Sequence, residues 1–356
     1  MFDLIIIGAG PAGISAAYEA KKHNLDYLEI EKGLIGNTVY QYPVGLTVFS
    51  TTNELELSPG GLKPAREKPT REELLSYYVR FVLENELKIQ TEEMVTSVVK
   101  SSVPYDAGVA TVSSNGAEGA SDGVVGAHYF TVKTNKRNYE AKNVLFAIGA
   151  MDYPRGLGVK GEDLPKVHDH FRETYPWVKK HALIVGGGNS AGEDALLLAQ
   201  EGAETTLAIF RGDWENADPK QGCIKYWVKQ PLEEELKEHC LKLFFLGKII
   251  EIRDGEVELE AESGERVTIE NDVVFVLIGS DADLTMLKSL GVATEQGKYG
   301  EVPVYDPEFF ETNVSGIYVA GHFTNHRHIK AAIEVPRSII PRLKEKMIAK
   351  TQRTQS

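Results

Sequence analysis

Two glycine-rich turns are the parts of this sequence whose residue types and spacing point most directly to chemistry. They read Gly8-Ala9-Gly10-Pro11-Ala12-Gly13 and Gly186-Gly187-Gly188-Asn189-Ser190-Ala191, with alanine at the last small position of the second. Each follows an apolar run that predicts a buried strand and opens a segment that predicts a helix. Glycines permit the tight turn and let N–H groups at the helix N-terminus approach a pyrophosphate. The sequence therefore predicts two dinucleotide sites in one chain.

The charged residue that ends the strand after each turn predicts which nucleotide binds there. Glu31 follows the first turn, and its carboxylate can accept both hydroxyls of an adenosine ribose and would repel a 2′-phosphate, which favours FAD or NAD(H). Arg211 follows the second turn, and a guanidinium can pair bidentately with a 2′-phosphate, which favours NADPH. A merely solvated Arg211 is the alternative, and Asp213 adds a negative charge nearby. Together the sites predict a flavin that receives a hydride from a nicotinamide.

Two further groups of residues could act on a bound flavin. Tyr40, Tyr42 and Phe49 lie in a segment, 37–50, that fits neither the helical nor the strand period and predicts a loop. Their rings either stack on the flavin or fix the loop. A cluster of bases follows the last glycine-ended strand and consists of His322, His326, Arg327, His328 and Lys330. Positive charge there would stabilise an anionic reduced flavin; a solvated turn is the alternative, and no acid–histidine spacing supports a metal site.

Two βαβ units are needed to position these residues, and the hydrophobic pattern predicts both. The first comprises a strand at 3–7, a helix over 12–23 and a strand at 25–30; the second comprises corresponding elements at 182–185, 191–201 and 205–210. Further buried strands end in glycine near Gly149, Gly279 and Gly321. We expect an α/β fold of two Rossmann-like, three-layer ββα dinucleotide-binding domains, with the NADPH domain inserted into the FAD domain. The expected bounds are 1–152 and 283–356 for the FAD domain and 153–282 for the NADPH domain.

Other elements carry their own signals. Thr70 and Glu73 form a capping-box pattern that predicts a helix over 70–85. Alternating residues between 94 and 139 predict a β-meander with a long hairpin, in which small residues are densest over 113–126. Pro336 interrupts an apolar helical pattern over 329–340 and is expected to kink or delay that helix.

Composition limits the function classes. The 356 residues, 42% of them hydrophobic, suffice for two cores. The formal net charge is -13 and Lys and Arg are scattered, so no nucleic-acid partner is expected. Cys223 and Cys240 form no CxxC pair and are expected to be structural or incidental, which fits a reducing cytoplasm. No apolar run approaches the roughly 18–20 residues of a membrane-spanning helix, so we expect a cytoplasmic protein with no membrane partner.

Over nearly the whole chain, the sequence resembles the two-dinucleotide flavoprotein reductases of the thioredoxin-reductase-like group, and within it the bacillithiol-disulfide reductase (YpdA-type) family. The similar segments are 40–43, 47–50, 68–71 and 161–167, with the second glycine turn and Arg211-Gly212. The resemblance implies FAD held by the first turn and Glu31, a flavin ring near residues 40–50, and NADPH bound by the second turn and Arg211. It also implies a homodimer or a higher homo-oligomer.

The residues that we expect to contact FAD or NADPH form one set, and two of them depart from the family. The set is Gly8, Gly10, Pro11, Ala12, Gly13, Glu31, Lys32, Tyr40, Tyr42, Phe49, Gly149, Gly186, Gly188, Asn189, Ser190, Ala191, Arg211, Gly279, Gly321, His322, Lys330 and Ala331. Ala12 stands where the resembled reductases have the cysteine of Gly-x-Gly-Pro-Cys-Gly, so no catalytic residue is assigned. His322 stands where many relatives in the wider group have an aspartate against the FAD ribityl chain.

These features predict an enzyme, an FAD-dependent pyridine nucleotide oxidoreductase. It would pass a hydride from NADPH to FAD and electrons on to a small acceptor such as a low-molecular-weight thiol disulfide. The alternative is a reductase of a ferredoxin or flavodoxin partner, which needs no active-site thiol. A flavin monooxygenase is disfavoured because Gly161 and His168 are more widely spaced than in that family's pattern. A redox-sensing protein that binds nucleotides without turnover is the non-enzymatic alternative.

Overall fold

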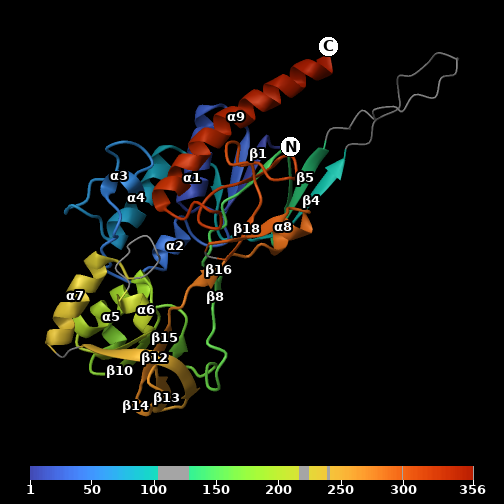
Figure 1. Ribbon diagram of the computed structural model, residues 1–356. Coiled ribbons are helices and arrows are strands. Elements are labelled where there is room, and N and C mark those ends of the chain that lie inside the picture. Colours follow the sequence, from blue (N-terminus) through green and yellow to red (C-terminus); the bar gives the residue numbers. More distant parts are fainter. Residues whose placement is uncertain (103–127, 216–223, 239–240, 299, 356) are drawn as a thin grey trace, which may run out of the picture.

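Two parallel-stranded sheets with separate hydrophobic cores make up the structure, a computed structural model that describes residues 1–102, 128–215, 224–238, 241–298 and 300–355 (Figure 1). A two-stranded ribbon of β8 (Tyr153–Pro154) and β16 (Ser280–Asp281) connects the two parts. The α/β architecture expected from the sequence is confirmed. The domain bounds near residues 152 and 282 stay our proposal, which the position of this ribbon supports.

The first sheet has the strand order β19-β7-β1-β2-β3, and all neighbours run parallel. Its strands are β1 (Leu4–Ile7), β2 (Tyr27–Ile30), β3 (Ile89–Gln90), β7 (Val144–Phe146) and β19 (Ile317–Val319). Every residue of β1 and β7 is buried, as expected for strands that are covered on both faces. Because β19 comes from the C-terminal part of the chain, the sequence returns to this sheet after forming the second one.

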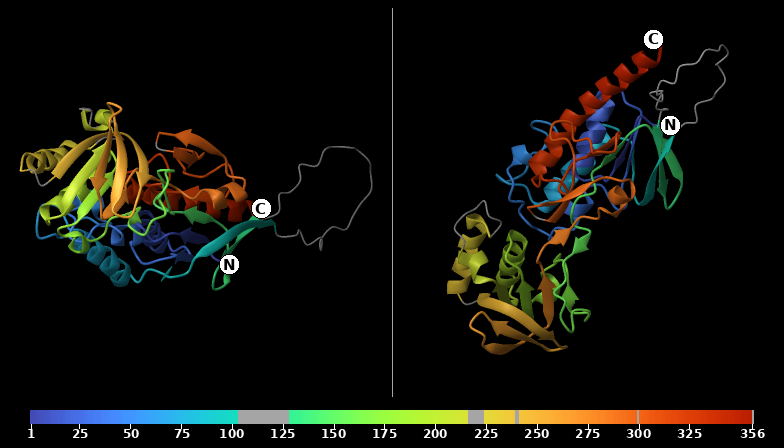
Figure 2. Two further views of the ribbon diagram at one scale, coloured as in Figure 1. Left: turned by 90° about the horizontal axis from the view of Figure 1, so that it is seen from below. Right: turned by 45° about the vertical axis from the view of Figure 1, so that its right-hand side comes forward.

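Helices cover one face of the first sheet and a β-meander covers the other, which gives three layers (Figure 2). The helices α1 (Pro11–Lys22), α4 (Arg71–Glu84) and α9 (Ile329–Gln355) pack with Leu4 and Ile6. The meander packs with Ile5 and Ile7 and consists of β4 (Val95–Ser102), β5 (His128–Thr134) and β6 (Asn138–Ala141). Alternate residues of β1 therefore belong to two cores.

The second sheet has the order β14-β13-β12-β11-β10-β15-β9. Its parallel part comprises β9 (Val167–His168), β10 (His181–Val185), β11 (Glu204–Ile209), β15 (Val273–Val276) and the first half of β12 (Leu241–Ile252). The second half of β12 pairs antiparallel with β13 (Glu256–Ala261), which pairs with β14 (Arg266–Glu270). The helices α5 (Asn189–Gln200) and α7 (Tyr226–Lys237) pack on one face of this sheet.

The remaining elements are short. They are α2 (Asn37–Tyr40), α3 (Thr52–Leu55), α6 (Arg211–Glu215), α8 (Thr285–Ser289), a 3-10 helix at Tyr175–Trp177, and the hairpin of β17 (Thr294–Gly297) and β18 (Gly300–Pro303). The capping box of Thr70 and Glu73 and the β-meander are confirmed, while the predicted tip at 113–126 lies outside the described residues.

One local expectation was wrong, and another was wrong in part. Segment 37–50 is not entirely a loop, because α2 forms one helical turn at its start. Helix α9 begins at Ile329 and continues through Pro336 and Pro341, so Pro336 does not delay the helix. The buried side chains of Ile333, Ile339 and Ile340 pack with α1, and this burial offsets the backbone hydrogen bond that a proline cannot donate.

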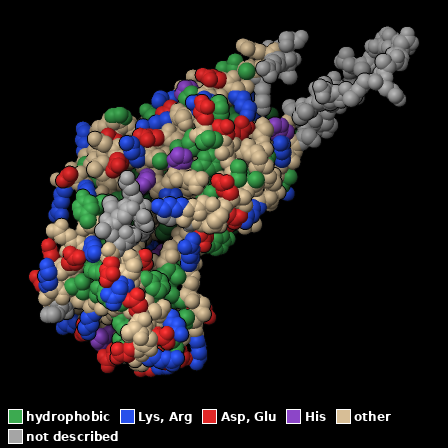
Figure 3. Space-filling model, in the orientation of Figure 1, with side chains coloured by type: hydrophobic (Ala, Val, Ile, Leu, Met, Phe, Trp, Pro, Cys, Tyr) green, Lys and Arg blue, Asp and Glu red, His purple; other side chains and the backbone are tan. Residues whose placement is uncertain are grey.

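The surface agrees with the scattered charge of the sequence. On the face drawn in Figure 3, Lys and Arg side chains are interspersed with Asp and Glu and do not form a single stripe. Within the part of the chain that the structure describes, no helix is both long and apolar enough to cross a membrane.

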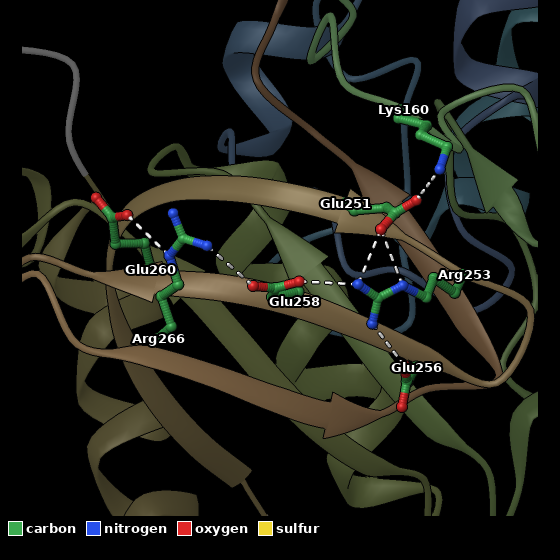
Figure 4. Close-up of polar contacts among 7 residues, drawn as sticks. All are labelled: Lys160, Glu251, Arg253, Glu256, Glu258, Glu260 and Arg266. Carbon is green, nitrogen blue, oxygen red and sulfur yellow. Dashed lines mark hydrogen bonds and ion pairs between the residues drawn. The ribbon is translucent and has the colours of Figure 1, made fainter.

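A network of charged side chains covers one surface of the second sheet (Figure 4). The Arg253 guanidinium donates hydrogen bonds to Glu251, Glu256 and Glu258 at 2.9, 2.6 and 2.8 Å. The Glu251 carboxylate also pairs with Lys160 at 2.5 Å. This last pair joins β12 to the segment of chain that leads from the ribbon into the second sheet.

Backbone contact at the same place explains Gly161. The Ile252 N–H donates to the Lys160 carbonyl oxygen at 3.0 Å. The next residue, Gly161, has a φ of +87°, and a side chain there would overlap the Ile252 carbonyl oxygen. Glycine at 161 therefore lets the chain pass close to β12.

We expect Gly161→Ala to destabilise the protein more than Gly264→Ala, although both glycines have a φ of +87°. No described atom lies within 4 Å of an added Cβ at Gly264, so only the left-handed backbone opposes alanine there, at about 1–2 kcal/mol. The Cβ at 161 also meets the Ile252 carbonyl oxygen, which should add roughly 1–3 kcal/mol. Urea unfolding followed by circular dichroism measures both losses, and equal losses would contradict the argument.

Candidate functional site

Close backbone contacts explain two glycines of the first turn. Gly8 follows β1 with a φ of +106°, and a Cβ there would lie 2.5 Å from the Ala147 carbonyl oxygen. A Cβ at Gly13 would overlap the Gly8 carbonyl oxygen and approach the Glu29 carboxylate. Helix α1 can therefore start directly against the end of β1 only because positions 8 and 13 are glycine.

Gly10 differs from these two because its face is open. No described atom lies within 4 Å of an added Cβ. Gly10 immediately precedes α1, Pro11 is the first helical residue, and no described side chain caps this helix end. The N–H groups of the first helical turn and the helix dipole are therefore available to a pyrophosphate, so the turn fits this part of FAD.

A cavity of about 430 Å³ opens beside the first turn. The predicted contact residues that line it are Gly8, Gly10, Pro11, Ala12, Glu31, Lys32, Tyr42, Gly149, Gly321 and His322. Gly13, Tyr40, Phe49, Lys330 and Ala331 lie outside its lining, as do the residues predicted at the second turn, Arg211 and Gly279. The first turn, the acid after β2 and the glycines after β7 and β19 thus converge on one space, because parallel strands end at the same edge of a sheet.

Glu31 lies at the wall of this cavity, directly after β2. Its carboxylate accepts hydrogen bonds from the N–H groups of Ala9 and Gly33, both at 2.7 Å. The neighbouring Lys32 pairs with Asp152 at 2.5 Å. A carboxylate held beside the first turn at the end of the adjacent strand fits the predicted contact with a ribose.

His322 lines the cavity after Gly321, but it does not supply the expected positive charge. Desolvation of its ring, together with the charges of Arg327 and His328, lowers the pKa of His322 to about 4. The ring is therefore neutral at neutral pH. His328 of the base cluster also lines the cavity, together with Ile329, the first residue of α9. The positive end of the α9 dipole therefore also faces this space.

The three aromatic residues of segment 37–50 separate into two environments. Tyr42 lines the cavity, and burial together with the charge of Glu193 raises its pKa to about 12. The Tyr40 ring instead lies 4.5 Å from the guanidinium of Arg172, and the Phe49 ring stacks on Trp227 of α7 at a centroid distance of 6.5 Å. Contacts with protein groups favour the loop-fixing role for Tyr40 and Phe49.

Several cavity-lining residues were missed in the sequence. They include Asn37, Thr38, Gln41, Asp169, His170 and Asp283. Asp169 and His170 directly follow β9, so a segment of the second sheet forms part of the wall. The His170 ring is hydrogen-bonded to the Asp169 carboxylate through Nδ1. No local pattern marks these residues, because the chain brings them to the cavity over long sequence separations.

Glu193 in α5 is a further residue that sequence reasoning missed. Burial raises the pKa of its carboxyl group to about 7, while the positive charge of Lys68 acts in the opposite direction. Because Glu193 also affects Tyr42, α5 of the second sheet lies close to segment 37–50 of the first. The sequence feature that could have found Glu193 is an acid just after the first turn of the helix that follows the second glycine-rich turn.

The second turn repeats the packing of the first with other small residues. A Cβ at Gly186 would overlap the Leu277 carbonyl oxygen and lie 2.9 Å from the Ala191 Cβ. Alanine at the third position is thus close-packed, as expected. Gly188 has no described atom within 4 Å of an added Cβ, and no described side chain caps α5 there. This turn also fits a pyrophosphate.

The other residues predicted for the second site have separate surroundings. Asn189 accepts a hydrogen bond from the Lys225 N–H at 2.8 Å, so its side chain positions the start of α7. Ser190 is exposed. Gly279 has a φ of +96° and lies near Arg155 of the connecting ribbon. None of these residues lines the cavity beside the first turn.

Arg211 follows β11 and is the first residue of α6. Its guanidinium donates to Glu262 at 2.6 Å and to Glu215 at 3.2 Å. It also lies 3.9 Å from the centre of the Phe245 ring. Arg211 is therefore a paired side chain, not a merely solvated one. Its position after the strand that follows the second turn fits the predicted contact with a 2′-phosphate.

Comparison with known proteins agrees with this arrangement. Residues 5–115 and 124–321 match the family model described as pyridine nucleotide-disulphide oxidoreductase. The chain is 32% identical over 317 residues to bacilliredoxin reductase Bdr of Bacillus subtilis, with 89% of this chain and 88% of that protein covered. It is 28% identical to a ferredoxin–NADP reductase of Ignicoccus hospitalis, with 91% and 90% covered.

A solved structure gives the same result. The bacillithiol disulfide reductase Bdr (YpdA) from Staphylococcus aureus has 30% sequence identity and a TM-score of 0.81, with 97% of this chain and 98% of that chain covered. The resemblance and the fold class predicted from the sequence are thereby confirmed. The chain belongs to the pyridine nucleotide-disulphide oxidoreductase family and is a flavin-dependent oxidoreductase whose cofactors are FAD and NADPH.

Proposed function

We propose that this protein oxidises NADPH and, by way of FAD, reduces a low-molecular-weight thiol disulfide. The overall reaction consumes NADPH, a proton and the disulfide, breaks the S–S bond, and yields NADP+ and two thiols. Bound FAD supplies hydride acceptance and two-electron delivery, which no side chain of the chain provides. The observation that carries the proposal is the cavity beside the first turn. Asp169 and His170, which follow β9 of the second sheet, form part of its wall, so both parts of the chain border the same space.

The chain's own residues would bind the cofactor and control its surroundings. The N–H groups that follow Gly10 would bind the pyrophosphate, and Glu31 would accept hydrogen bonds from ribose hydroxyls. His322, with a pKa of about 4, is neutral and offers one ring N–H donor. Tyr42, with a pKa of about 12, remains a protonated phenol that can donate a hydrogen bond into the cavity.

The name of one similar solved structure, a bacillithiol disulfide reductase, supports a disulfide as the acceptor. Ala12 lines the cavity but has no thiol, so it cannot form a mixed disulfide with the acceptor. Cys223 and Cys240 lie outside the described residues. We therefore infer that a small disulfide is reduced inside the cavity without a thiol intermediate at position 12.

A protein acceptor such as ferredoxin is the second candidate. Ala12 favours it, because electron delivery to a protein partner needs no thiol in the cavity. The likeness to a ferredoxin–NADP reductase over 91% of this chain also supports it. The two candidates share the NADPH half of the reaction and differ only in what accepts the electrons.

Rapid mixing with NADPH should bleach the flavin absorption band within seconds, and bacillithiol disulfide should restore it. We expect a steady-state rate of NADPH oxidation that saturates with disulfide concentration, since the acceptor must enter a defined cavity. Mixing without acceptor is the control. A rate that saturates with ferredoxin and does not respond to any disulfide would select the second candidate, and the absence of bleaching would reject both.

Substituting the open glycine of each turn should separate the two nucleotide sites. Gly10→Ala and Gly188→Ala leave the protein contacts intact, because no described atom lies within 4 Å of either added Cβ. Each methyl group would occupy the space that a pyrophosphate needs. We expect Gly10→Ala to lower FAD content about tenfold or more and Gly188→Ala to weaken NADP+ binding similarly while keeping FAD. Each variant is the control for the other; loss of both ligands in both variants would contradict separate sites.

Arg211→Met should raise the KM for NADPH and leave the KM for NADH unchanged. Hydrogen bonds to a charged group contribute about 1.5–3 kcal/mol, so an increase of roughly tenfold or more is expected. Methionine keeps much of the side-chain volume over the Phe245 ring. Steady-state kinetics with both cofactors measures the ratio. An equal increase for NADPH and NADH would show that Arg211 does not contact the 2′-phosphate.

A further inference from the structure

The arginine assigned to the 2′-phosphate is held by carboxylates of the same chain. The Arg211 Nε lies 2.6 Å from the Glu262 carboxylate, and Nη1 lies 3.2 Å from that of Glu215. Glu215 is one helical turn further along α6, so it follows Arg211 wherever α6 moves. Glu262 comes from a different element, the turn between β13 and β14.

The backbone fixes Glu262 in this position. Its N–H donates to the Phe245 carbonyl oxygen at 3.0 Å, and the Phe245 ring lies beneath the Arg211 guanidinium at 3.9 Å. One residue of β12 therefore contacts both partners of the ion pair. The hairpin turn therefore holds the Glu262 backbone against β12, and the Glu262 carboxylate reaches Arg211 from that position.

A third carboxylate adds negative charge to the same site. The Asp213 side chain lies against Gly187, where a Cβ would overlap its carboxylate. The second turn and the start of α6 are therefore in contact, which places Arg211 and its two acidic partners next to the turn that would bind a pyrophosphate. Any nucleotide that binds here meets acids as well as the arginine.

We propose that Glu262 occupies the Arg211 guanidinium in place of a 2′-phosphate and so limits how strongly the site discriminates NADPH from NADH. The inference rests on the proposed role of Arg211. A guanidinium offers five N–H donors, and a phosphate binds it best through two parallel bonds. Glu262 already uses the Nε–H, so a phosphate must displace it or bind beside a like charge.

The competition acts only on nucleotides that carry a 2′-phosphate. An unphosphorylated ribose does not need the guanidinium, so Glu262 leaves its binding unchanged. Arg211 and Glu262 have side chains that are 43% and 52% exposed, and exposed ion pairs are weak. Removing the charge of Glu262 should therefore tighten binding of a 2′-phosphate about two- to fivefold.

Calorimetric titration of the FAD-loaded, full-length protein with 2′,5′-ADP and with 5′-ADP tests this inference without relying on turnover. We expect Glu262→Gln to bind 2′,5′-ADP about two- to fivefold more tightly than the unmodified protein, with 5′-ADP unchanged. Glu265→Gln is the matched control, because it removes the same charge from an exposed position of the same turn. Glu262→Ala, tested in parallel, should behave like Glu262→Gln.

Three results would overturn the inference, and Arg211→Met distinguishes the first two. If Arg211→Met reduces the preference for 2′,5′-ADP over 5′-ADP but both Glu262 variants leave it unchanged, the role of Glu262 is wrong and the proposed NADPH site stands. If Arg211→Met leaves that preference unchanged, the assignment of Arg211 fails and the inference about Glu262 fails with it. Equal tightening by Glu262→Gln and Glu265→Gln would assign the effect to overall charge and also reject the proposal.

Discussion

The contact between helix α1 and the end of strand β1 is the constraint on which the rest of the site depends. The helix starts so close to the strand that a Cβ at Gly13 would overlap the Gly8 carbonyl oxygen. This contact directs the N-terminus of α1 toward the edge of the sheet, where the cavity lies. The buried hydroxyl of Ser15, which donates to the Ile333 carbonyl oxygen of α9 at 2.6 Å, continues the packing on the other side of the helix. One backbone approach thus sets the positions of the turn, the cavity and α9.

The second nucleotide site repeats this constraint with a different residue. Ala191 takes the place of the third glycine and its Cβ forms part of the packing against Gly186, so the same geometry is reached with a small side chain. What differs is the charge at the end of the following strand, with a carboxylate at Glu31 and a guanidinium at Arg211. We therefore propose that the backbone of each turn allows a nucleotide to bind, and that Glu31 and Arg211 determine which nucleotide is preferred.

How much of the fold and the site could be predicted follows from the range of the interactions involved. The turns, the strands before them and the capping box of α4 depend on residues that are neighbours in sequence, and these were predicted. Asp169, His170 and Glu193 gain their positions from the packing of one part of the chain against another, which no periodicity encodes. The delay of α9 that was considered at Pro336 does not occur for a related reason, because the burial of this helix against α1 outweighs the local effect of the proline.

The Glu29 side chain of β2 lies beside Gly13, at the point where α1 approaches the end of β1. Its side chain is fully buried, and both carboxyl oxygens lack a hydrogen-bond partner among the described residues. Burial, with a smaller effect of the charge on Glu31, raises the pKa of Glu29 well above its ordinary value, which favours the protonated form. Glu31, two residues on, has both oxygens hydrogen-bonded to backbone N–H groups. Two carboxyl groups two residues apart thus differ in their surroundings because only Glu31 reaches N–H donors of the glycine turn, and Glu31 is the one that lines the cavity.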